Sequence, residues 1–389
     1  MNQISRPDPA ARARAVAPVI AAAGDAIERE GRLVPAVLDA LYEARLFRMF
    51  LARAFGGDEM HPADYAQAVE EISRHDGSVG WCVFQACSGS LLAAYMDPDA
   101  AREVFADPRA TTAWGPPGKP EARAVPGGYL VSGSWLFASG CRHASWMGAH
   151  GHVRESDGSL RRDSAGNPVT RSLLFPAHHA RINDDWDTIG LRGTASDSYE
   201  VDEVFVPEAF SATREDLSAR RTPGKLFAFS QQGLYAVGSA SVALGLAQAM
   251  LDGFVDLARG KAPRGMSRLA DHPVLHTQLA QTEARLAASR ALLHASLRDA
   301  WDLAEETAPL PLNARARVRL AAIHAIETAA TAADYAYKAA GADAIFKANG
   351  FERRFRDVHT LTQQVQSRLA NFEPIGRIML GGEGDRPIL

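Results

Sequence analysis

Residues 133–146 read GSWLFASGCRHASW and raise the question of which flat molecule this chain binds. The stretch combines three large aromatic residues with two glycines, two alanines and three serines. It is too aromatic for a loop in solvent and too rich in small residues for an ordinary strand. Small residues let a backbone approach a ligand closely, and large rings shield that ligand from water. Residues 133–146 are therefore the first candidate site.

Strand patterns surround this stretch. Residues 129–135, YLVSGSW, alternate in strand fashion, and the PGG before them is a turn. Short strands and polar turns continue over residues 145–153, 170–177 and 180–208. We therefore predict one compact β domain over residues 111–215.

Helices are predicted before the β domain. Residues 10–33 and 35–49 carry apolar side chains at helical spacing. Residues 61–76 begin with a proline and early acids, as helix N-termini do, and residues 78–96 have the composition of a buried helix. We predict an N-terminal helical domain over residues 1–110.

Helical periodicity returns after the β domain. The predicted helical segments are residues 235–261, 272–306, 312–341 and 357–381. We predict a C-terminal bundle of the four-helix kind over residues 216–389. The fold class expected from this order is mostly α with a central β domain.

The composition excludes several classes of protein. A length of 389 residues, 47% hydrophobic and 23% charged, is ordinary for a globular protein of about two or three domains, or of one large domain. The net charge of -4 leaves no basic surface for nucleic acid, and no apolar run approaches the ~20 residues of a membrane span. We therefore expect neither a nucleic-acid partner nor a membrane-spanning segment.

Cysteine usage and the N-terminal segment favour the cytoplasm. Cys82, Cys87 and Cys141 are an odd number without a CxxC pair, which fits a reducing compartment and argues against disulfides or a zinc site. The first residues lack the basic start, apolar block and cleavage site of a signal peptide. We expect a cytoplasmic protein.

The order of these parts, together with specific residues, resembles the acyl-CoA dehydrogenase fold. More closely, it resembles the flavin-dependent monooxygenases of that fold, the oxygenase components of two-component aromatic hydroxylases. Among them we single out the indole-3-acetate monooxygenase type. The motifs that carry the resemblance are DGSVGWC (76–82), WGPPG (114–118), GSWLFASGCRHASW (133–146), GLRGTASDSYEVDEVFVPE (190–208) and RRFRDVHTLTQQVQ (353–366).

The resemblance covers essentially the whole chain. It implies an N-terminal helical domain, a β-barrel-like middle domain and a C-terminal four-helix bundle. It also implies that the flat molecule beside residues 133–146 is the isoalloxazine ring of a flavin. Trp135 and Phe137 would supply an apolar wall, and Ser139 a hydroxyl or N–H near flavin N5. The alternative is a strand in the core of the β domain.

Two other motifs are candidate flavin contacts. Trp114 would stack near the ring or close the substrate pocket, or else pack on a rigid Pro-Pro turn. In LRGTAS, Thr194 and Ser196 would hydrogen-bond the flavin and Arg192 would offer a cation, unless the motif is a plain β-turn. The chain has neither a GxGxxG after a strand nor a GxxxxGK[ST] motif. We therefore expect the flavin between the β domain and the helical bundle.

Three functions remain open for this fold. A monooxygenase uses reduced flavin, FADH2 or FMNH2, and O2 to form a C4a-hydroperoxide that must be kept dry. An FAD-dependent acyl-CoA dehydrogenase needs a carboxylate base shortly before the last helix. There this chain has a threonine or leucine, with Asp357 about one helical turn away. A non-enzymatic scaffold is the third alternative.

Histidines used by phenol-hydroxylating relatives are missing at their expected places. Gln364 stands where the last-helix histidine is expected, and the Gln85–Cys87 stretch replaces a second one. Gln364 retains a hydrogen-bond donor for oxygen or substrate, and an electron-rich indole needs no base. His143 is a candidate catalytic residue and His359 a candidate substrate residue.

Other histidines carry weaker indications. His75, His150 and His152 are further candidates for the missing role. The HxH spacing of His150 and His152 puts both on one face of a strand without a third ligand, so we expect no metal site.

The expected substrate pocket lies between the flavin, the helix after DGS and the final helices. Its expected lining is Trp81, Phe84, Gln85, Trp114, His143 and Gln364. An aromatic, neutral lining favours a small electron-rich aromatic such as indole-3-acetate over a long acyl chain. The resemblance also implies a flavin reductase as partner and a homotetramer with flavin sites near subunit boundaries.

Overall fold

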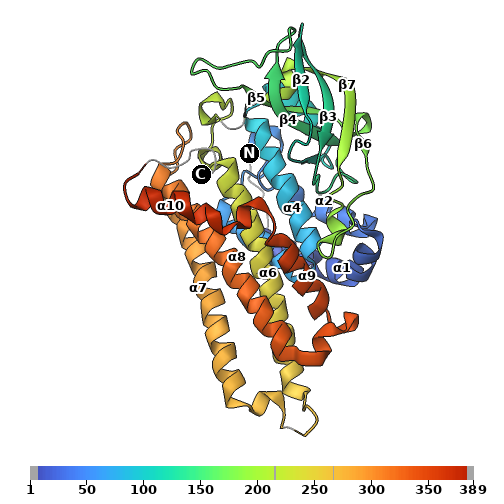
Figure 1. Cartoon of the computed structure of the whole chain (residues 1–389), viewed down its shortest axis with the longest axis vertical. Helices are drawn as coiled ribbons and strands as arrows, with labels where there is room; N and C mark the ends of the chain where they lie inside the picture. Colours follow the sequence, from blue (N-terminus) through green and yellow to red (C-terminus); the bar gives the residue numbers. More distant parts are fainter. Residues whose placement is uncertain (1–7, 214–215, 266, 383–389) are drawn as a thin grey trace, which may run out of the picture.

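The protein consists of N-terminal helices, a central sheet and long C-terminal helices, as Figure 1 shows in blue, green and yellow to red. The computed structural model describes residues 8–213, 216–265 and 267–382. The sheet sits at one end of the molecule, and the long helices run away from it. The predicted order of helices, β module and helices is confirmed.

The N-terminal helices begin at residues that the sequence marks clearly. They are α1 (Pro9–Glu30), α2 (Pro35–Glu43), α3 (Pro62–His75), α4 (Gly77–Ser90) and α5 (Pro98–Val104). Four of them start with proline. The first turn of a helix tolerates proline because a backbone N–H at that position would have no partner within the helix. The carboxylate of Asp76 caps α4 by accepting from Val79 N at 3.0 Å. Every residue of α4 is buried, so this helix crosses the interior.

The middle region is one mixed sheet. Its strands are β1 (Thr112–Trp114), β2 (Glu121–Val125), β3 (Gly128–Trp135), β4 (Trp146–Arg154), β5 (Thr170–Pro176), β6 (Arg181–Ile182), β7 (Tyr199–Pro207) and β8 (Ser211–Ala212). The order is β6-β7-β3-β2-β4-β5-β8, and β1 pairs with β4. Strands β1 and β2 run parallel to β4, and the other pairs are antiparallel. This path runs from β6 to β8 through one mixed sheet, which lies between the two helical regions in chain order, as the expected fold class requires.

The C-terminal region is built on α6 (Gln231–Gly260), α7 (Pro273–Leu303), α8 (Leu312–Ala340), α9 (Phe351–Leu361) and α10 (Phe372–Met379). Helix α6 is rich in small residues and packs closely on α3. A Cβ on Gly245 would lie 2.3 Å from the carbonyl oxygen of Glu70, so only glycine fits there. Helix α6 is also long and apolar enough to cross a membrane, but 89% of its most apolar window is buried, which makes it a core helix.

The predicted helix over residues 357–381 is interrupted. Helix α9 ends at Leu361, and the short 3-10 turns η12 (Val365–Ser367) and η13 (Leu369–Asn371) precede α10. Side chains form hydrogen bonds with the backbone in this segment. Gln364 Oε1 accepts from Gln366 N at 2.6 Å, and Asn371 Nδ2 donates to Val365 O at 2.8 Å. Such bonds compete with the helical ladder. Gln364 therefore lies in a turn and not on a helix.

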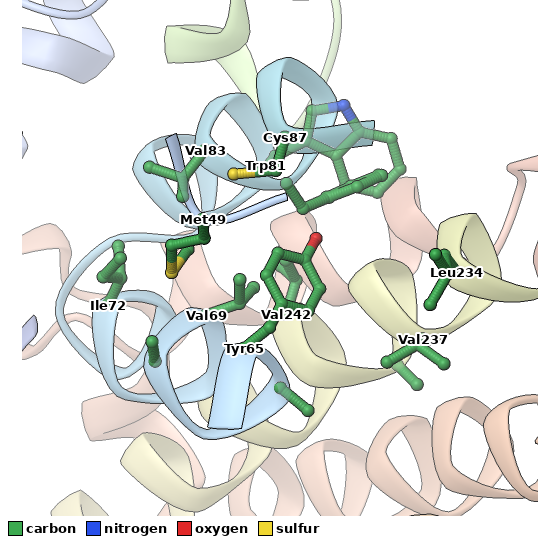
Figure 2. Close-up of a cluster of buried hydrophobic side chains, with 14 of the residues drawn as sticks. Met49, Tyr65, Val69, Ile72, Trp81, Val83, Cys87, Leu234, Val237 and Val242 are labelled. Carbon is green, nitrogen blue, oxygen red and sulfur yellow. The ribbon is translucent and has the colours of Figure 1, made fainter. Parts of the chain in front are cut away.

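Helices α3, α4 and α6 share one apolar core, which Figure 2 shows in close-up. Tyr65 from α3, Trp81 from α4 and Leu234 from α6 all contribute to it. This core supports α4 from one side, while the loops of the sheet meet α4 from the other. The candidate site lies where these loops and α4 come together.

Candidate active site

Two loops of the sheet join into one surface beside α4. Residues 136–145 connect β3 to β4, and residues 190–198 lead into β7 through the 3-10 turn η5 (Arg192–Thr194). Backbone hydrogen bonds tie them together: Ala138 N donates to Asp197 O at 3.0 Å, and Gly140 N donates to Thr194 O at 2.9 Å. Two motifs that are distant in sequence thus form a single site.

A chain of side-chain hydrogen bonds runs through this site. The indole N–H of Trp81 donates to Ser139 Oγ at 2.9 Å. Ser139 Oγ lies 2.6 Å from Ser196 Oγ, which lies 2.7 Å from Thr194 Oγ1, and Thr194 Oγ1 donates to Leu191 O at 2.7 Å. All five residues are buried. The structure therefore brings Trp81, Ser139, Thr194 and Ser196, all selected from the sequence, into one network.

Backbone strain gathers at the same place. Six described residues other than glycine have a positive φ, and three of them lie here: Phe137 at 56°, Leu191 at 51° and Ala195 at 43°. Bulky residues in this conformation are costly, and they persist where the surrounding structure holds them. Such strain is common at functional sites.

Phe137 and Ser139 give this surface the features that a flavin ring needs. The Phe137 side chain is 58% exposed although it is large and apolar, and Trp186 meets it edge-on at 6.0 Å between ring centroids. Ser139 lies two residues away with a hydroxyl that has one acceptor position to spare. An apolar face next to a hydrogen-bonding group fits the face and edge of an isoalloxazine ring.

Trp135 does not belong to this surface, and its predicted role as a flavin wall is wrong. Its side chain is 1% exposed, stacks on Tyr199 at 5.4 Å and donates from Nε1 to His150 O at 3.0 Å. The reason is that β3 ends at Trp135 with this ring turned into the sheet core, whereas Phe137 lies in the loop beyond the strand.

Arg192 and Asp197 hold the loop that leads into β7. Arg192 Nη1 donates to Thr188 O at 2.8 Å and lies 3.3 Å from Asp187 Oδ1. Asp197, which the sequence analysis missed, is 3% exposed and accepts from Arg142 Nε at 2.8 Å and from the backbone of Trp186 at 3.0 Å. No local pattern marks Asp197, because all these partners are at least eleven residues away.

A series of aromatic contacts leads away from Trp81. Its ring centroid lies 4.7 Å from Phe84, which lies 5.2 Å from Tyr235 at the start of α6. Tyr235 in turn lies 6.0 Å from Trp114, which lies 6.4 Å from His150. All four pairs meet edge to face, the geometry that aromatic quadrupoles favour. Tyr235 is the member that the sequence analysis missed.

Polar groups and two hollows lie beside this series of aromatic side chains. The hydroxyl of Tyr235 donates to Gln85 Oε1. Two small adjoining hollows, partly open to solvent, share Leu92 and Gln231 in their linings. The larger also contains Trp114 and His150. Neither lining includes a carboxylate, a lysine or an arginine, and aromatic side chains form part of each lining.

The other candidate residues make contacts outside the Ser139 network. Burial lowers the pKa of His143 to about 4, so its ring is neutral at physiological pH. His359 Nε2 lies 3.0 Å from Asp334 Oδ1, on the side of α9 that faces α8. Gln364 uses its Oε1 to cap the η12 turn. Phe84 is fully buried behind Trp81 and Tyr235.

Two buried carboxyl groups lie beneath the site. Asp76 caps α4, and Asp357 Oδ1 accepts from Leu191 N at 2.6 Å. Burial raises the pKa of Asp76 to about 6. Burial and the nearby charge of Asp76 raise the pKa of Asp357 to about 7. Both backbone groups of Leu191 are therefore held by side chains. Asp357 accepts from its N–H, and Thr194 donates to its carbonyl oxygen.

Family models match both helical parts of the chain. The model described as "Acyl-CoA dehydrogenase, N-terminal domain" matches residues 10–103, and "Acyl-CoA dehydrogenase, C-terminal domain" matches residues 237–368. The indole-3-acetate monooxygenase of Pseudomonas putida is 29% identical over 361 residues, which cover 91% of this chain and 89% of that protein. The FADH(2)-dependent resorcinol hydroxylase oxygenase component of Rhizobium sp. (strain MTP-10005) is 32% identical over 285 residues, 69% of this chain and 67% of that protein.

Solved structures show the same architecture along the whole chain. XiaF from Streptomyces sp., in complex with FADH2 and glycerol, superposes with a TM-score of 0.85 and 27% identity, covering 98% of this chain and 96% of XiaF. The 3-HSA hydroxylase from Rhodococcus sp. RHA1 superposes with a TM-score of 0.88, covering 98% of this chain and 99% of the hydroxylase. Its identity of 23% makes this a likeness of fold.

Proposed function

Because the chain belongs to the acyl-CoA dehydrogenase family, as the oxygenase component of a two-component flavin-dependent monooxygenase, we propose that it oxygenates a small aromatic of the indole class. Reduced flavin, FADH2 or FMNH2, is the cofactor. When bound, reduced flavin would supply the activated oxygen that is transferred to the substrate, with O2 as its source. The remaining work of positioning and water exclusion is done by residues of this chain.

Each residue of the site has a distinct part in this proposal. Phe137 would lie against the face of the flavin ring, and Ser139 would bind its N5 edge. Trp81 holds the Ser139 hydroxyl in place through the 2.9 Å hydrogen bond. Gln85, oriented by Tyr235, offers its amide to the substrate. Trp114 lines the substrate space and helps to keep it dry, and it packs edge to face on Tyr235, which Phe84 supports from behind.

The observation that carries the indole class is the aromatic series from Trp81 to His150, beside a hollow whose lining has no carboxylate, lysine or arginine. A planar ring gains both buried area and favourable aromatic geometry in such surroundings. An electron-rich indole needs no base for oxygenation, which agrees with the low pKa of His143, because a low pKa makes its ring a weak base. The named activity of the Pseudomonas putida relative on indole-3-acetate supports the same class.

Acyl-CoA dehydrogenation is the alternative, and the carboxylates of this chain disfavour it. That reaction needs a carboxylate facing the substrate beside the flavin. Asp357 is the nearest acid in the last-helix motif, but its Oδ1 accepts from Leu191 N at 2.6 Å and its side chain is buried. The lining of the two hollows offers no other carboxylate.

The decisive experiment supplies the purified protein with enzymatically reduced FAD or FMN, O2 and a panel of indoles, phenols and acyl-CoAs. We expect turnover of an indole with one oxygen atom incorporated from ¹⁸O-labelled O2. Turnover confined to acyl-CoA with an artificial electron acceptor, without oxygen incorporation, would overturn the proposed function.

A flavin reductase is the partner that an oxygenase component requires. Reduced flavin reacts quickly with O2 in free solution. Its transfer from the reductase to the oxygenase is therefore efficient only when both proteins are in the same compartment. We place this exchange in the cytoplasm, where the three free, buried cysteines are also compatible with the redox state.

A further inference from the structure

The hydrogen-bond chain through Ser139 has only one possible direction. Its first member, the indole N–H of Trp81, is a donor and never an acceptor. Its last member, the carbonyl of Leu191, is an acceptor and never a donor. Thr194 must therefore donate its single hydroxyl hydrogen to Leu191, and Ser196 must donate its own to Thr194.

The hydroxyl hydrogen of Ser139 is then committed as well. With Ser196 donating onward, the 2.6 Å contact between the two serines requires Ser139 to donate to Ser196. Ser139 Oγ accepts from Trp81 with one lone pair and has one lone pair left. The backbone N–H of Ser139 is also occupied, because it donates to Phe137 O at 2.9 Å. Ser139 consequently offers an incoming ligand an acceptor and no donor.

The two redox states of a flavin differ at the atom that meets this group. Reduced flavin carries a hydrogen on N5 and donates there, whereas oxidised flavin has an unprotonated N5 that only accepts. A buried acceptor facing another acceptor leaves both without a partner, and such mismatches cost more than a missing contact in water.

On the basis of the proposed flavin site beside Ser139, we propose that the Trp81–Ser139–Ser196–Thr194 chain selects reduced over oxidised flavin by fixing the polarity of the Ser139 hydroxyl. Thr194 and Ser196 act without touching the flavin, because they determine where the Ser139 hydrogen points. They are specificity-determining residues for the redox state of the cofactor. With this preference, the protein would release oxidised flavin after turnover and bind a new molecule of reduced flavin.

Two substitutions free the Ser139 hydrogen without removing the hydroxyl itself. Thr194→Val keeps the side-chain shape and removes the donor to Leu191, so the chain loses its fixed direction. Ser196→Ala removes the acceptor of the Ser139 hydrogen directly. Thr188→Val is the matched control, because Thr188 Oγ1 donates to Gly190 O at 3.0 Å in the same loop but lies outside the chain.

The measurement is anaerobic titration calorimetry of each protein with oxidised and with dithionite-reduced FAD and FMN. We expect Thr194→Val and Ser196→Ala to tighten oxidised flavin about threefold to tenfold, the value of one hydrogen bond, with little change for reduced flavin. A tenfold fall in this preference corresponds to about 30 mV in the two-electron midpoint potential of the bound flavin, which provides a second readout. Thr188→Val should match the wild type in both titrations.

Ser139→Ala separates failure of the inference from failure of the flavin site. Suppose that Ser139→Ala loses affinity for reduced flavin while Thr194→Val and Ser196→Ala keep wild-type affinities. This result would support the flavin site beside Ser139 but overturn the inference about hydroxyl polarity. Unchanged affinities for both flavin states in Ser139→Ala would place the flavin elsewhere and overturn both. Thermal melts of all variants check that each change acts on a folded protein.

Discussion

The indole nitrogen of Trp81 lies 2.9 Å from the hydroxyl oxygen of Ser139, and this hydrogen bond joins residues 58 positions apart. It connects α4, which lies in the helical core, to the β3–β4 loop of the sheet. The β3–β4 loop is therefore held against a rigid helix and not only by its own strand. Pre-organisation of this kind is what a site that must protect a reactive cofactor requires.

Replacing Ser139 by alanine tests the catalytic importance of this group. We expect Ser139→Ala to fold normally and to release several-fold more hydrogen peroxide per product, because one hydrogen bond is worth about 0.5–1.5 kcal/mol. Product by chromatography and peroxide by a coupled assay, both under saturating reduced flavin, give the ratio. A wild-type ratio would return Ser139 to a purely structural role.

Tyr235→Phe tests the proposed orientation of the substrate. The change removes the hydroxyl that donates to Gln85 Oε1 and keeps the ring that packs on Phe84 and Trp114. We expect the KM for the aromatic substrate to rise several-fold with a smaller change in kcat, since loss of one hydrogen bond costs about 1 kcal/mol. The control is Tyr337→Phe, whose ring stacks on Phe355 between α8 and α9. Equal kinetic constants for Tyr235→Phe and its control would contradict this role.

Asp357→Asn is expected to change the pH dependence of stability. The folded protein holds the pKa of Asp357 at about 7, above its ordinary value of 3.8, so folding binds a proton in the interval between them. Stability from this group is therefore present below about pH 4 and is lost as the pH rises to about 7, by an amount on the order of a few kcal/mol. Asparagine can still accept from Leu191 N but does not titrate.

Melting temperatures measured from about pH 5 to pH 8 give the comparison. The decline of the wild type over this range should be shallower in Asp357→Asn. The exposed Asp256 of α6, changed to asparagine, serves as a control that should keep the wild-type slope. Parallel curves for wild type and Asp357→Asn would show that this carboxyl does not titrate in the range.

The assembly is expected to be a homotetramer. Several large apolar residues of the C-terminal region remain more than half exposed, among them Ile345, Phe346, Leu369, Met379 and Leu380. We expect these side chains to be covered at interfaces between copies of the chain. Light scattering at micromolar concentration should give four chains, and Phe346→Glu should reduce that number. A monomeric wild type under these conditions would refute the expectation.

The sequence by itself determined the elements and their order. Helical spacing of apolar residues marked the long helices, and proline at their first turns marked where several of them begin. These features are local, because they depend on residues within one or two turns of each other. The motif around Ser139 was also recognisable, since aromatic and small residues stand side by side in the chain.

Only the tertiary structure decided which side of each motif faces the site. Trp135 and Phe137 look equivalent in sequence, but the end of β3 buries the first and exposes the second. Side-chain bonds of Gln364 and Asn371 broke a segment whose periodicity predicted one helix. Both outcomes depend on partners that helical or strand periodicity does not encode.

The direction of the Ser139 hydroxyl is the clearest case. Trp81, Ser139, Ser196 and Thr194 were each selected from the sequence as separate candidates. Their common chain, and its anchoring at the Leu191 carbonyl, depends on three segments that meet only after folding. A hydroxyl points where its neighbours in space require, so its polarity is a property of the folded protein and not of the local sequence.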